Sequence, residues 1–353
     1  MKILFLPSWY PHRYNFTAGI FVQRHAECVA QHTTNKVAVL YVFNKQDADR
    51  IDFEVVDAII NEVSTFTVYY HPVKFYFPLL TQIQRYLKWK KAYAIGWNHL
   101  HKKFGMPDGL HVQVILKAGI IALQLKKKFH LPFIITEHWS GYDRKVGTYK
   151  SWFQKYFTKK IVKDAEVIAP INQNIIHHML NHNLKAEYTV VTNVVDTDLF
   201  KPIVHQNKVC RFVHVSNFKS EKNTVGILHA IKKLSLIRND FEVIIAGGRT
   251  YFEETKQVYD SLKFDGQQVK LVGKLLPTEV SNLIANGDVF LLFSHYEGLP
   301  CSIVEAWACG IPVLSSDVGG ISEYLDESNG RLVTAGNENE LVQAMSWMID
   351  NHK

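Results

Sequence analysis

Short apolar runs alternate with amphipathic stretches along almost the whole chain. The apolar runs are nearly continuous and do not alternate with polar residues. Such runs are typical of parallel strands that are buried on both faces of a sheet. The predicted strands are residues 3–6, 37–42, 112–115, 133–136, 167–170, 188–191, 212–215, 241–246, 269–272, 289–293 and 312–315.

Between these runs, apolar residues recur with the spacing of a helix that covers a core with one face. The predicted helices are residues 20–31, 119–129, 175–184, 223–236, 277–286 and 338–349. Strands that alternate with helices predict an α/β fold with parallel sheets, whose ligands bind at the carboxyl ends of the strands.

A polar stretch near residues 193–208 is the predicted hinge of the chain. It divides the sequence into two Rossmann-like domains, residues 1–198 and 199–353. The length of 353 residues is sufficient for two domains of ordinary size. We expect the two domains to face each other across a cleft, which is a natural site for a small molecule.

The composition indicates a globular protein, because 47% of the residues are hydrophobic and 21% are charged. The net charge of +7 and the pI of about 9.0 favour polyanionic partners, which are a nucleotide diphosphate, an acidic membrane leaflet or a nucleic acid. The sequence has no recognised RNA- or DNA-binding motif, so no nucleic-acid partner is expected.

We expect the protein to be cytoplasmic. Its four cysteines are scattered and form no C-x-x-C pair, which is typical of reduced thiols. The first apolar run ends at Pro7 and is too short for a signal peptide. Lys117 and Lys126 interrupt the longest apolar stretch, so no membrane span is predicted.

The segment of residues 294–320 carries the clearest candidate chemistry. Glu297 and Glu305 flank a Gly-Leu-Pro turn and the beginning of a short helix. A helix N-terminus suits a diphosphate, and a carboxylate accepts hydrogen bonds from sugar hydroxyls. A structural reading is also open, in which Ser302 and Glu305 form a capping box and Gly310 ends the helix. That reading leaves Glu297 unexplained.

Two Asp-x-Asp triplets, Asp47 to Asp49 and Asp196 to Asp198, invite a metal-dependent reading. About one such match is expected by chance in a chain of this size, and a motif needs context. We therefore predict no metal. The sequence also lacks the hydrolase, zinc-protease, P-loop and dinucleotide-binding motifs.

Several blocks in the same order resemble glycosyltransferase family 4, the retaining GT-B enzymes of the glycosyl transferases group 1. That family carries two glutamates eight positions apart, as Glu297 and Glu305 are here. Residues 7–21, 136–138, 192–200 and 216–223 resemble its first loop, central histidine, linker and phosphate loop. One departure is Ser216-Asn217 where the family has Gly-Arg, and Lys219 stands where it could supply the missing charge.

The resemblance implies a GT-B fold and a nucleotide-diphosphate sugar held mainly by the second domain, with no metal or other cofactor. Lys222 and Glu297 would act at the reacting sugar, and His138 would lie across the cleft. The acceptor would meet Trp9, Tyr10 and His138. The donor-binding residues implied are Gly19, Lys219, Lys222, Gly273, Lys274, Glu297, Gly298, Leu299, Pro300, Ser302 and Glu305.

Each of these residues also has a structural reading. The two lysines of residues 219–222 could belong to a solvated turn, because charge clusters are usually exposed. His138 could be a satisfied polar side chain, and Gly19 could be an ordinary helix-start glycine. The order of the family motifs favours the functional readings together.

Residues 71–103 and 152–160 are rich in aromatic and basic side chains. Such stretches suit the surface of an anionic leaflet near a lipid-linked acceptor, which predicts peripheral membrane binding. An ordinary amphipathic helix with aromatic residues in the core is the other reading.

The resulting prediction is a cytoplasmic, retaining, metal-independent glycosyltransferase of a surface polysaccharide or lipid-linked glycan. The alternatives are a GT-B nucleotide-sugar epimerase and a non-catalytic sugar-binding relative. The donor base, the sugar and the acceptor are left open, since a few pocket contacts decide specificity.

Overall fold

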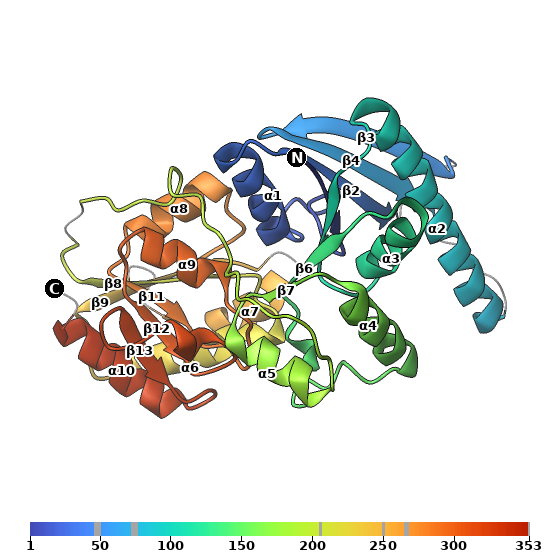
Figure 1. The fold of residues 1–353 in the computed structure, drawn as a ribbon. Helices are drawn as coiled ribbons and strands as arrows, with labels where there is room; N and C mark the ends of the chain where they lie inside the picture. The colour runs from blue at the N-terminus through green and yellow to red at the C-terminus, as the bar shows by residue number, and fades with distance from the viewer. Residues whose placement is uncertain (46–50, 72–76, 205–206, 249–250, 265–267, 352–353) are drawn as a thin grey trace. The chain divides into compact units, whose positions relative to one another are not determined.

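The computed structural model describes residues 1–45, 51–71, 77–204, 207–248, 251–264 and 268–351 (Figure 1). The chain divides into two compact units. The first unit comprises residues 1–171 and 176–194, and the second unit residues 172–175 and 195–353. The division predicted between residues 198 and 199 lies four residues further along the chain than the main one observed.

The described residues of the first unit form a seven-stranded sheet with the order β3-β4-β2-β1-β5-β6-β7. Its pairs are parallel, apart from the antiparallel hairpin β3–β4. The strands are β1 Lys2–Pro7, β2 Lys36–Asn44, β3 Phe53–Ile60, β4 Val63–Tyr70, β5 Gly109–Gln113, β6 Phe133–Glu137 and β7 Ile168–Pro170. The helices are α1 Ile20–His32, α2 Pro78–Lys103, α3 Ala118–Phe129, α4 Trp152–Asp164 and α5 Gln173–Asn181, whose first residues fall in the second unit.

The described residues of the second unit form a six-stranded, wholly parallel sheet with the order β10-β9-β8-β11-β12-β13. Its strands are β8 Cys210–Ser216, β9 Phe241–Gly247, β10 Val269–Val272, β11 Val289–Leu292, β12 Val313–Ser316 and β13 Gly330–Val333. Its helices are α6 Thr224–Ser235, α7 Phe252–Leu262, α8 Pro277–Ala285, α9 Cys301–Ala308 and α10 Glu338–Asn351.

The sheet of the second unit is covered on both faces, which explains its continuous apolar strands. Phe212 of β8 packs into the core below α6 and α10. The next residue, Val213, packs into the separate core with α8 and α9. Both residues are fully buried, so consecutive positions of one strand serve two cores. The α/β fold with two parallel-sheet domains is thus confirmed.

Each sheet has one point at which the chain reverses its direction of winding. In the first unit, β1 lies between β2 and β5, and in the second unit β8 lies between β9 and β11. In open α/β sheets, ligands bind outside the carboxyl ends of the strands at such a switch point. The ends of β1, β5, β8 and β11 are therefore where a site is expected.

Two local expectations differ from the structure. Residues 188–191 form no strand, and Tyr188 makes a single bridge to Ile168. Strand β7 ends at Pro170, which has no amide hydrogen to extend a ladder. The β3–β4 hairpin was not predicted. It turns at Asn61 and Glu62, whose φ angles of 46° and 68° are those of a primed hairpin turn.

Candidate active site

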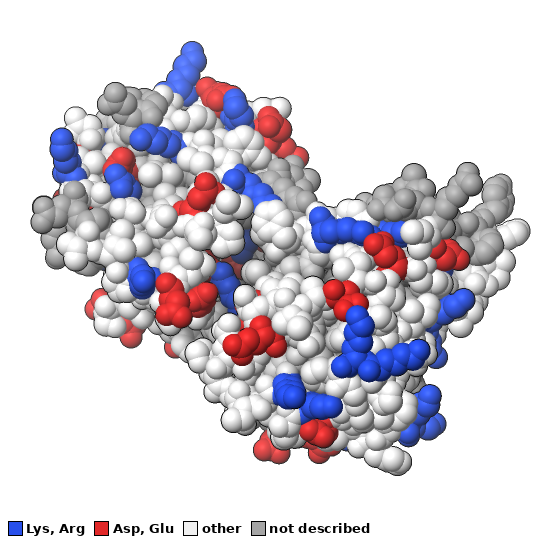
Figure 2. All heavy atoms as spheres, turned by 90° about the horizontal axis from the view of Figure 1, so that it is seen from above, with Lys and Arg blue, Asp and Glu red and all other residues white. Residues whose placement is uncertain are grey.

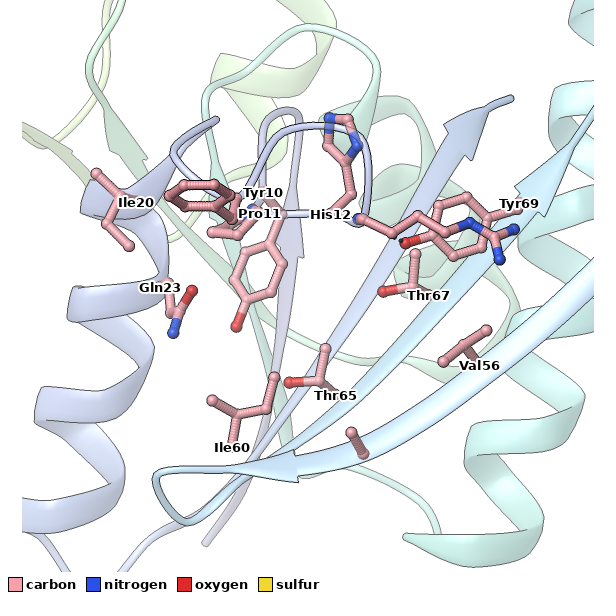
Figure 3. A pocket seen from close by; sticks show the side chains of 13 residues that line it. Tyr10, Pro11, His12, Ile20, Gln23, Val56, Ile60, Thr65, Thr67 and Tyr69 are labelled. Atoms are coloured by element: carbon pink, nitrogen blue, oxygen red, sulfur yellow. Dashed lines mark hydrogen bonds between the residues drawn. The ribbon is translucent and has the colours of Figure 1, made fainter. Parts of the chain in front are cut away.

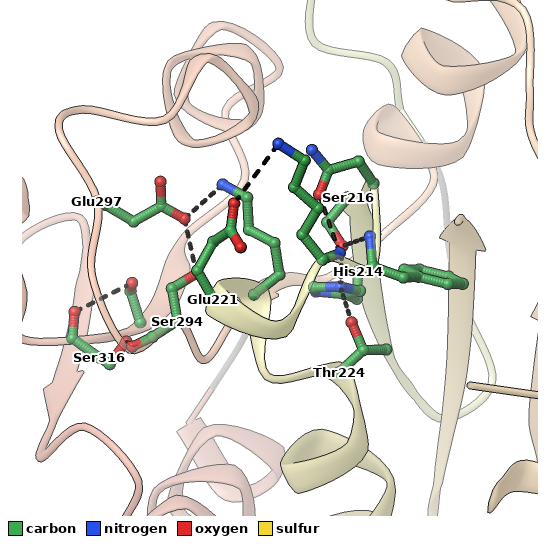
Figure 4. A network of polar contacts seen from close by, with 12 residues as sticks. His214, Ser216, Glu221, Thr224, Ser294, Glu297 and Ser316 are labelled. Carbon is green, nitrogen blue, oxygen red and sulfur yellow. Dashed lines mark hydrogen bonds and ion pairs between the residues drawn. The ribbon is translucent and has the colours of Figure 1, made fainter. Parts of the chain in front are cut away.

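An ion pair between Lys222 and Glu297 lies at the switch point of the second unit (Figure 4). Lys222 Nζ lies 2.5 Å from Glu297 Oε1, and the two side chains are 18% and 9% exposed. Ser294 Oγ donates to the same carboxylate oxygen at 2.6 Å. The pair joins the loop after β8 to the loop after β11, which brings together two residues that the family resemblance had singled out.

The loop that carries Glu297 is held in place from β12. Ser316, the last residue of β12, donates through Oγ to the carbonyl oxygen of Ser294 at 2.6 Å. The Gly320 amide donates to the carbonyl oxygen of Gly298 at 3.0 Å. Ser294 and Ser316 are fully buried. The candidate sugar-facing carboxylate therefore rests on a rigid support, which a binding site requires.

The loop that carries Lys222 depends on a buried histidine of β8. His214 Nδ1 donates to the carbonyl oxygen of Leu291 in β11 at 2.8 Å, so its Nε2 accepts from Ser216 Oγ at 2.9 Å. Burial lowers the pKa of His214 to about 4, so the ring is neutral at pH 7. Ser216 Oγ in turn accepts from the amide of Phe218 and shapes the turn before the 3₁₀ helix η2 (Ser220–Lys222).

The capping box that the structural reading offered at Ser302 does not form. Helix α9 begins at Cys301 with Pro300 as its N-cap, and no side chain caps it. Ser302 is therefore the second helical residue. Glu305 lies in the helix interior with 7% exposure. The turn of Gly298, Leu299 and Pro300 thus delivers backbone amide groups of α9 to the edge of the sheet, where anions bind.

The predicted end of α9 is confirmed. Gly310 adopts a left-handed φ of +73°. Its amide donates to the carbonyl oxygen of Trp307, and the Ile311 amide donates to that of Ala306, both at 2.9 Å. These two bonds form a Schellman motif, which fixes the length of the helix.

Three further candidate donor residues, Gly273, Lys274 and Lys219, follow strands of the second sheet at the same edge. Gly273 follows β10, and its carbonyl oxygen accepts from the amide of Gly247 at the end of β9. The next residue, Lys274, is exposed. The Lys219 side chain is 49% exposed, with its Nζ 3.9 Å from Glu221 Oε1. These residues do not belong to the Lys222–Glu297 cluster, and their role in donor binding stays a prediction.

In the first unit, His138 follows β6 and belongs to a buried polar chain. Its Nε2 donates to Gln113 Oε1 at 2.8 Å. Gln113 is fully buried at the end of β5, and its Nε2 donates to His111 Nε2 at 3.1 Å. Burial lowers the pKa of His111 to about 3 and that of His138 well below its usual value. Both rings are therefore neutral at pH 7.

Helix α1 packs against His138. The Phe21 ring lies 4.5 Å from the His138 ring, and that of His25 lies 5.3 Å from it. At the start of α1, a β-carbon on Gly19 would come within 2.5 Å of the Trp9 carbonyl group. The protein's own backbone therefore accounts for this glycine, whose φ is also positive at +62°.

The two aromatic residues predicted for acceptor binding differ in exposure. Trp9 is 40% exposed and contacts Phe21 edge to face. Tyr10 is only 1% exposed. Trp9 is thus accessible at the surface of the first unit, whereas Tyr10 is accessible only from within a pocket.

Glu137 precedes His138 in the motif of residues 136–138, and no role was predicted for it. It is fully buried and accepts from the Ile115 amide, the Trp139 amide and the Tyr142 hydroxyl. Burial raises its pKa to about 7. The carboxyl group fixes the loops after β5 and β6, and so fixes the position of His138.

Gln113, Ser294 and Ser316 were not found from the sequence. Gln113 and Ser316 are the last residues of their strands, and Ser294 follows β11 by two positions. A polar residue where a buried strand ends is a weak signal by itself. A systematic search for that position would have found all three.

No group of three or more His, Cys, Asp or Glu side chains suited to a metal occurs within the described ranges. Asp196 Oδ1 accepts from the amides of Asp198 and Leu199 at 3.0 and 3.1 Å, so this triplet forms a turn. The triplet of Asp47 and Asp49 lies outside the described residues.

The two helices predicted for a membrane surface differ in burial. In α2, the C-terminal half buries Ala92, Tyr93 and Leu100, while Ile83 and Leu87 are exposed. Residues 72–76 of this stretch lie outside the described residues. Helix α4 exposes Trp152, Phe153 and Tyr156. None of the helices in the described ranges is long and apolar enough to cross a bilayer.

Basic side chains on the face shown in Figure 2 are interspersed with acidic ones. Ion pairs occur among the described residues of both units: Lys126 Nζ lies 2.7 Å from Glu166 Oε1, and Lys233 Nζ lies 2.9 Å from Glu338 Oε2. The excess positive charge is thus partly compensated locally, which reduces its effect on polyanions at physiological salt.

Residues 195–353 match the family model for glycosyl transferases group 1. An uncharacterized glycosyltransferase of Methanocaldococcus jannaschii is 26% identical over 264 residues, which are 74% of this chain and 70% of that protein. N-acetyl-alpha-D-glucosaminyl L-malate synthase of Bacillus anthracis is 25% identical over 203 residues, 54% of this chain and 52% of that protein. A probable sucrose-phosphate synthase of Thermosipho melanesiensis is 25% identical over 279 residues, 72% of this chain and 65% of that protein.

Solved structures have the same fold at lower identity. Sucrose-phosphate synthase from Thermosynechococcus elongatus has a TM-score of 0.75 and 19% identity over 100% of this chain and 90% of that chain. The Anabaena protein HepE, solved with UDP-glucose, has a TM-score of 0.70 and 17% identity over 99% of this chain and 90% of that chain.

Proposed function

The chain belongs, through residues 195–353, to the glycosyl transferases group 1 and is a glycosyltransferase, and from this we propose how it acts. It transfers a sugar from a nucleotide-diphosphate donor, with retention of configuration and without a metal. The acceptor is a glycan or a lipid-linked glycan of a surface polysaccharide. The HepE structure with UDP-glucose supports a donor of this class.

The Lys222–Glu297 pair at the switch point of the second sheet carries this proposal. On donor binding, the Lys222 ammonium group turns to the diphosphate, which bears more charge than one carboxylate. Glu297 is then available to accept from hydroxyl groups of the sugar, while Ser294 keeps it in position. The uncapped start of α9 adds amide donors to the diphosphate.

In this reaction the negative charge develops on the leaving diphosphate. Lys222 and the α9 amides stabilise that charge, and the leaving phosphate takes the proton of the acceptor hydroxyl. The remaining work of the protein is to hold donor and acceptor in position. His138 contributes as a neutral ring, which the hydrogen bond from its Nε2–H to Gln113 holds in position.

We also propose that the reaction takes place at the cytoplasmic face of an anionic membrane. The exposed aromatic residues of α4 alternate with lysines, a composition that suits the interface of a bilayer. Flotation with anionic and with zwitterionic vesicles tests this. Binding to neither at low salt contradicts it.

The donor proposal is tested by thermal shift with UDP, GDP, ADP and their sugars, with and without EDTA. We expect one nucleotide family to raise the melting temperature, and the shift to persist in EDTA. Lys222→Ala should abolish the shift. Lys256→Ala is the matched control, because that lysine pairs with Asp260 on the surface of α7. The anomeric configuration of the product, read by NMR, tests retention.

No shift with any nucleotide would contradict the donor site. A shift without transfer to any acceptor would favour a sugar-binding relative, and an epimerised donor sugar would favour an epimerase. Loss of the shift in EDTA would contradict metal independence.

A further inference from the structure

The first unit contains a pocket of about 460 Å³ that none of the predicted donor contacts uses (Figure 3). The loop between β1 and α1 forms one side, the first turns of α1 form a second, and β3 and β4 form the floor. Its lining residues from the floor and α1 are Val56, Ala58, Ile60, Thr65, Thr67 and Gln23.

The floor is one face of the β3–β4 hairpin. Val56 pairs with Thr67, and Ala58 pairs with Thr65, so these four side chains point to the same side. The intervening residue Asp57 points to the other side, where it binds His99 and Lys103 of α2. Strand alternation thus separates a face held by α2 from a face that lines the pocket.

The pocket gathers apolar side chains that the fold leaves in water. Phe16, Val56 and Ile60 are 47%, 41% and 38% exposed, although each is large and apolar. Contiguous exposed apolar surface in a concave site marks a place where an apolar group binds. A ligand there would remove this surface from water.

The pocket also contains two buried hydroxyl groups that lie close to each other, those of Tyr10 and Thr65. Tyr10 is 1% exposed and Thr65 is 6% exposed, and both line the pocket. Tyr10 Oη and Thr65 Oγ1 make no hydrogen bond of normal geometry within the described residues. Each hydroxyl has the other as a near neighbour, and buried polar groups are nearly always satisfied, so an oxygen of a ligand would complete their hydrogen bonding. Burial raises the pKa of Tyr10, which therefore remains a donor.

The one guanidinium group in the lining is already engaged. Arg13 binds Glu54 through both terminal nitrogens and stacks on the Tyr69 ring at 4.0 Å. A phosphate or sulfate would have to compete with that carboxylate. The lining therefore favours an uncharged, largely apolar ligand that carries an oxygen.

We propose that this pocket binds the apolar end of the acceptor, an alkyl or isoprenoid chain, with its first oxygen at Tyr10 and Thr65. The inference rests on the proposed glycosyl transfer. Helix α1 connects the pocket to the candidate centre within the first unit: Ile20 and Gln23 line the pocket, while Phe21 contacts His138. A chain seated in the pocket is thus positioned by the helix that packs against His138.

Calorimetry with octyl glucoside below its critical micelle concentration, with methyl glucoside as the comparison probe, tests the proposal. We expect the wild-type protein to bind octyl glucoside. Methyl glucoside should bind at least tenfold more weakly. Ala58→Trp fills the pocket and should weaken the binding of octyl glucoside at least tenfold. Ile59→Trp is the matched control, because Ile59 lies on the opposite face of β3 with 80% exposure, and should bind as the wild type does.

Two further variants keep the test decisive if Ala58→Trp does not fold. Val56→Trp fills the pocket from the same face of β3. Thr65→Val removes one buried hydroxyl group while it keeps the shape of the side chain, and it should weaken the binding of octyl glucoside several-fold. The proposal would be overturned if the pocket-filling variants bound octyl glucoside as tightly as the wild type does. It would also be overturned if the two glucosides bound equally well, or if octyl glucoside did not bind.

The nucleotide thermal shift, measured on the same samples, separates this inference from the proposed function. A nucleotide shift without octyl glucoside binding overturns the pocket alone. Octyl glucoside binding that follows the expected pattern, without any nucleotide shift, supports the pocket and overturns the donor site.

Discussion

Gly319 lies directly against the backbone of Glu297, so that a β-carbon on Gly319 would come within 2.0 Å of the Glu297 carbonyl oxygen. The φ of Gly319 is +63°, a conformation that side chains rarely adopt. Two constraints therefore require glycine there, and one of them acts on the candidate sugar-facing residue.

Gly319→Ala should both destabilise the second unit and weaken donor binding. The left-handed backbone alone costs about 1–2 kcal/mol for alanine, and the close contact adds to this. Gly336→Ala is the matched control: its φ is +76°, but the nearest atom to its added β-carbon is 3.9 Å away. Urea unfolding should show a larger loss of stability at Gly319, and calorimetry should show weaker nucleotide binding only there. Equal losses at both positions would contradict the prediction.

The ion pair of Lys222 and Glu297 should show a measurable coupling in the ligand-free protein. Both side chains are largely buried, so water screens the pair less than a surface pair. A double-mutant cycle with Lys222→Met and Glu297→Gln should give a coupling free energy of about 1–3 kcal/mol. Urea unfolding of the four proteins measures it. The surface pair of Lys256 and Asp260 should give a clearly smaller coupling in the same experiment, because water screens it.

His214 should make the second unit sensitive to acid. Its pKa is about 4 in the folded state against 6.5 for the ordinary group, so the unfolded chain binds the proton more readily. The stability that the neutral His214 ring contributes is fully present above pH 6.5 and is lost as the pH falls towards 4. The loss from this residue is on the order of 3 kcal/mol at most, from 1.36 kcal/mol per pKa unit.

Unfolding midpoints in urea between pH 4.5 and 7 measure that loss. His214→Gln should flatten the pH profile without removing it. In the first unit, burial lowers the pKa of His25 and His111 in the same direction, so part of the slope remains. A profile that His214→Gln leaves unchanged would contradict the prediction.

Gln113 should act as a positioning residue. Gln113→Leu keeps the shape of the side chain but removes the acceptor of the His138 Nε2–H. We expect kcat for transfer to fall about tenfold, since misplacement of a site residue acts on the chemical step. The nucleotide thermal shift should be unchanged because Gln113 belongs to the first unit. A change in donor KM with constant kcat would contradict this role.

The strands that were predicted correctly are those that are buried on both faces of the sheet. In β11, for example, Leu291 and Leu292 pack into different cores, so every position is apolar and the run is plain in the sequence. In β3, residues 56–60 are all exposed, although four of these five residues are apolar. The pattern of apolar residues alone does not distinguish a strand of the core from an exposed strand that lines a pocket.

The candidate site was predictable only where a motif fixes a residue. Lys222 and Glu297 stand 75 positions apart, and only their place in a family pattern joins them before the fold is known. Ser302 and Glu305 match a capping box in the sequence, but the box does not form, because Pro300 is the N-cap of the helix. Gln113 contacts His138, and Ser294 contacts Ser316, and only the tertiary structure brings these pairs together.

Strand β3 has consequences beyond the pocket that it lines. It ends the sheet, so one of its edges has no neighbouring strand in the described part of the first unit. Its eight residues include three large exposed apolar side chains, Val56, Ile59 and Ile60. Such an edge favours self-association at high concentration. Glu54 and Asp57 are its only charges. Two copies of the strand placed edge to edge in antiparallel register would bring these carboxylates towards each other, which disfavours that pairing.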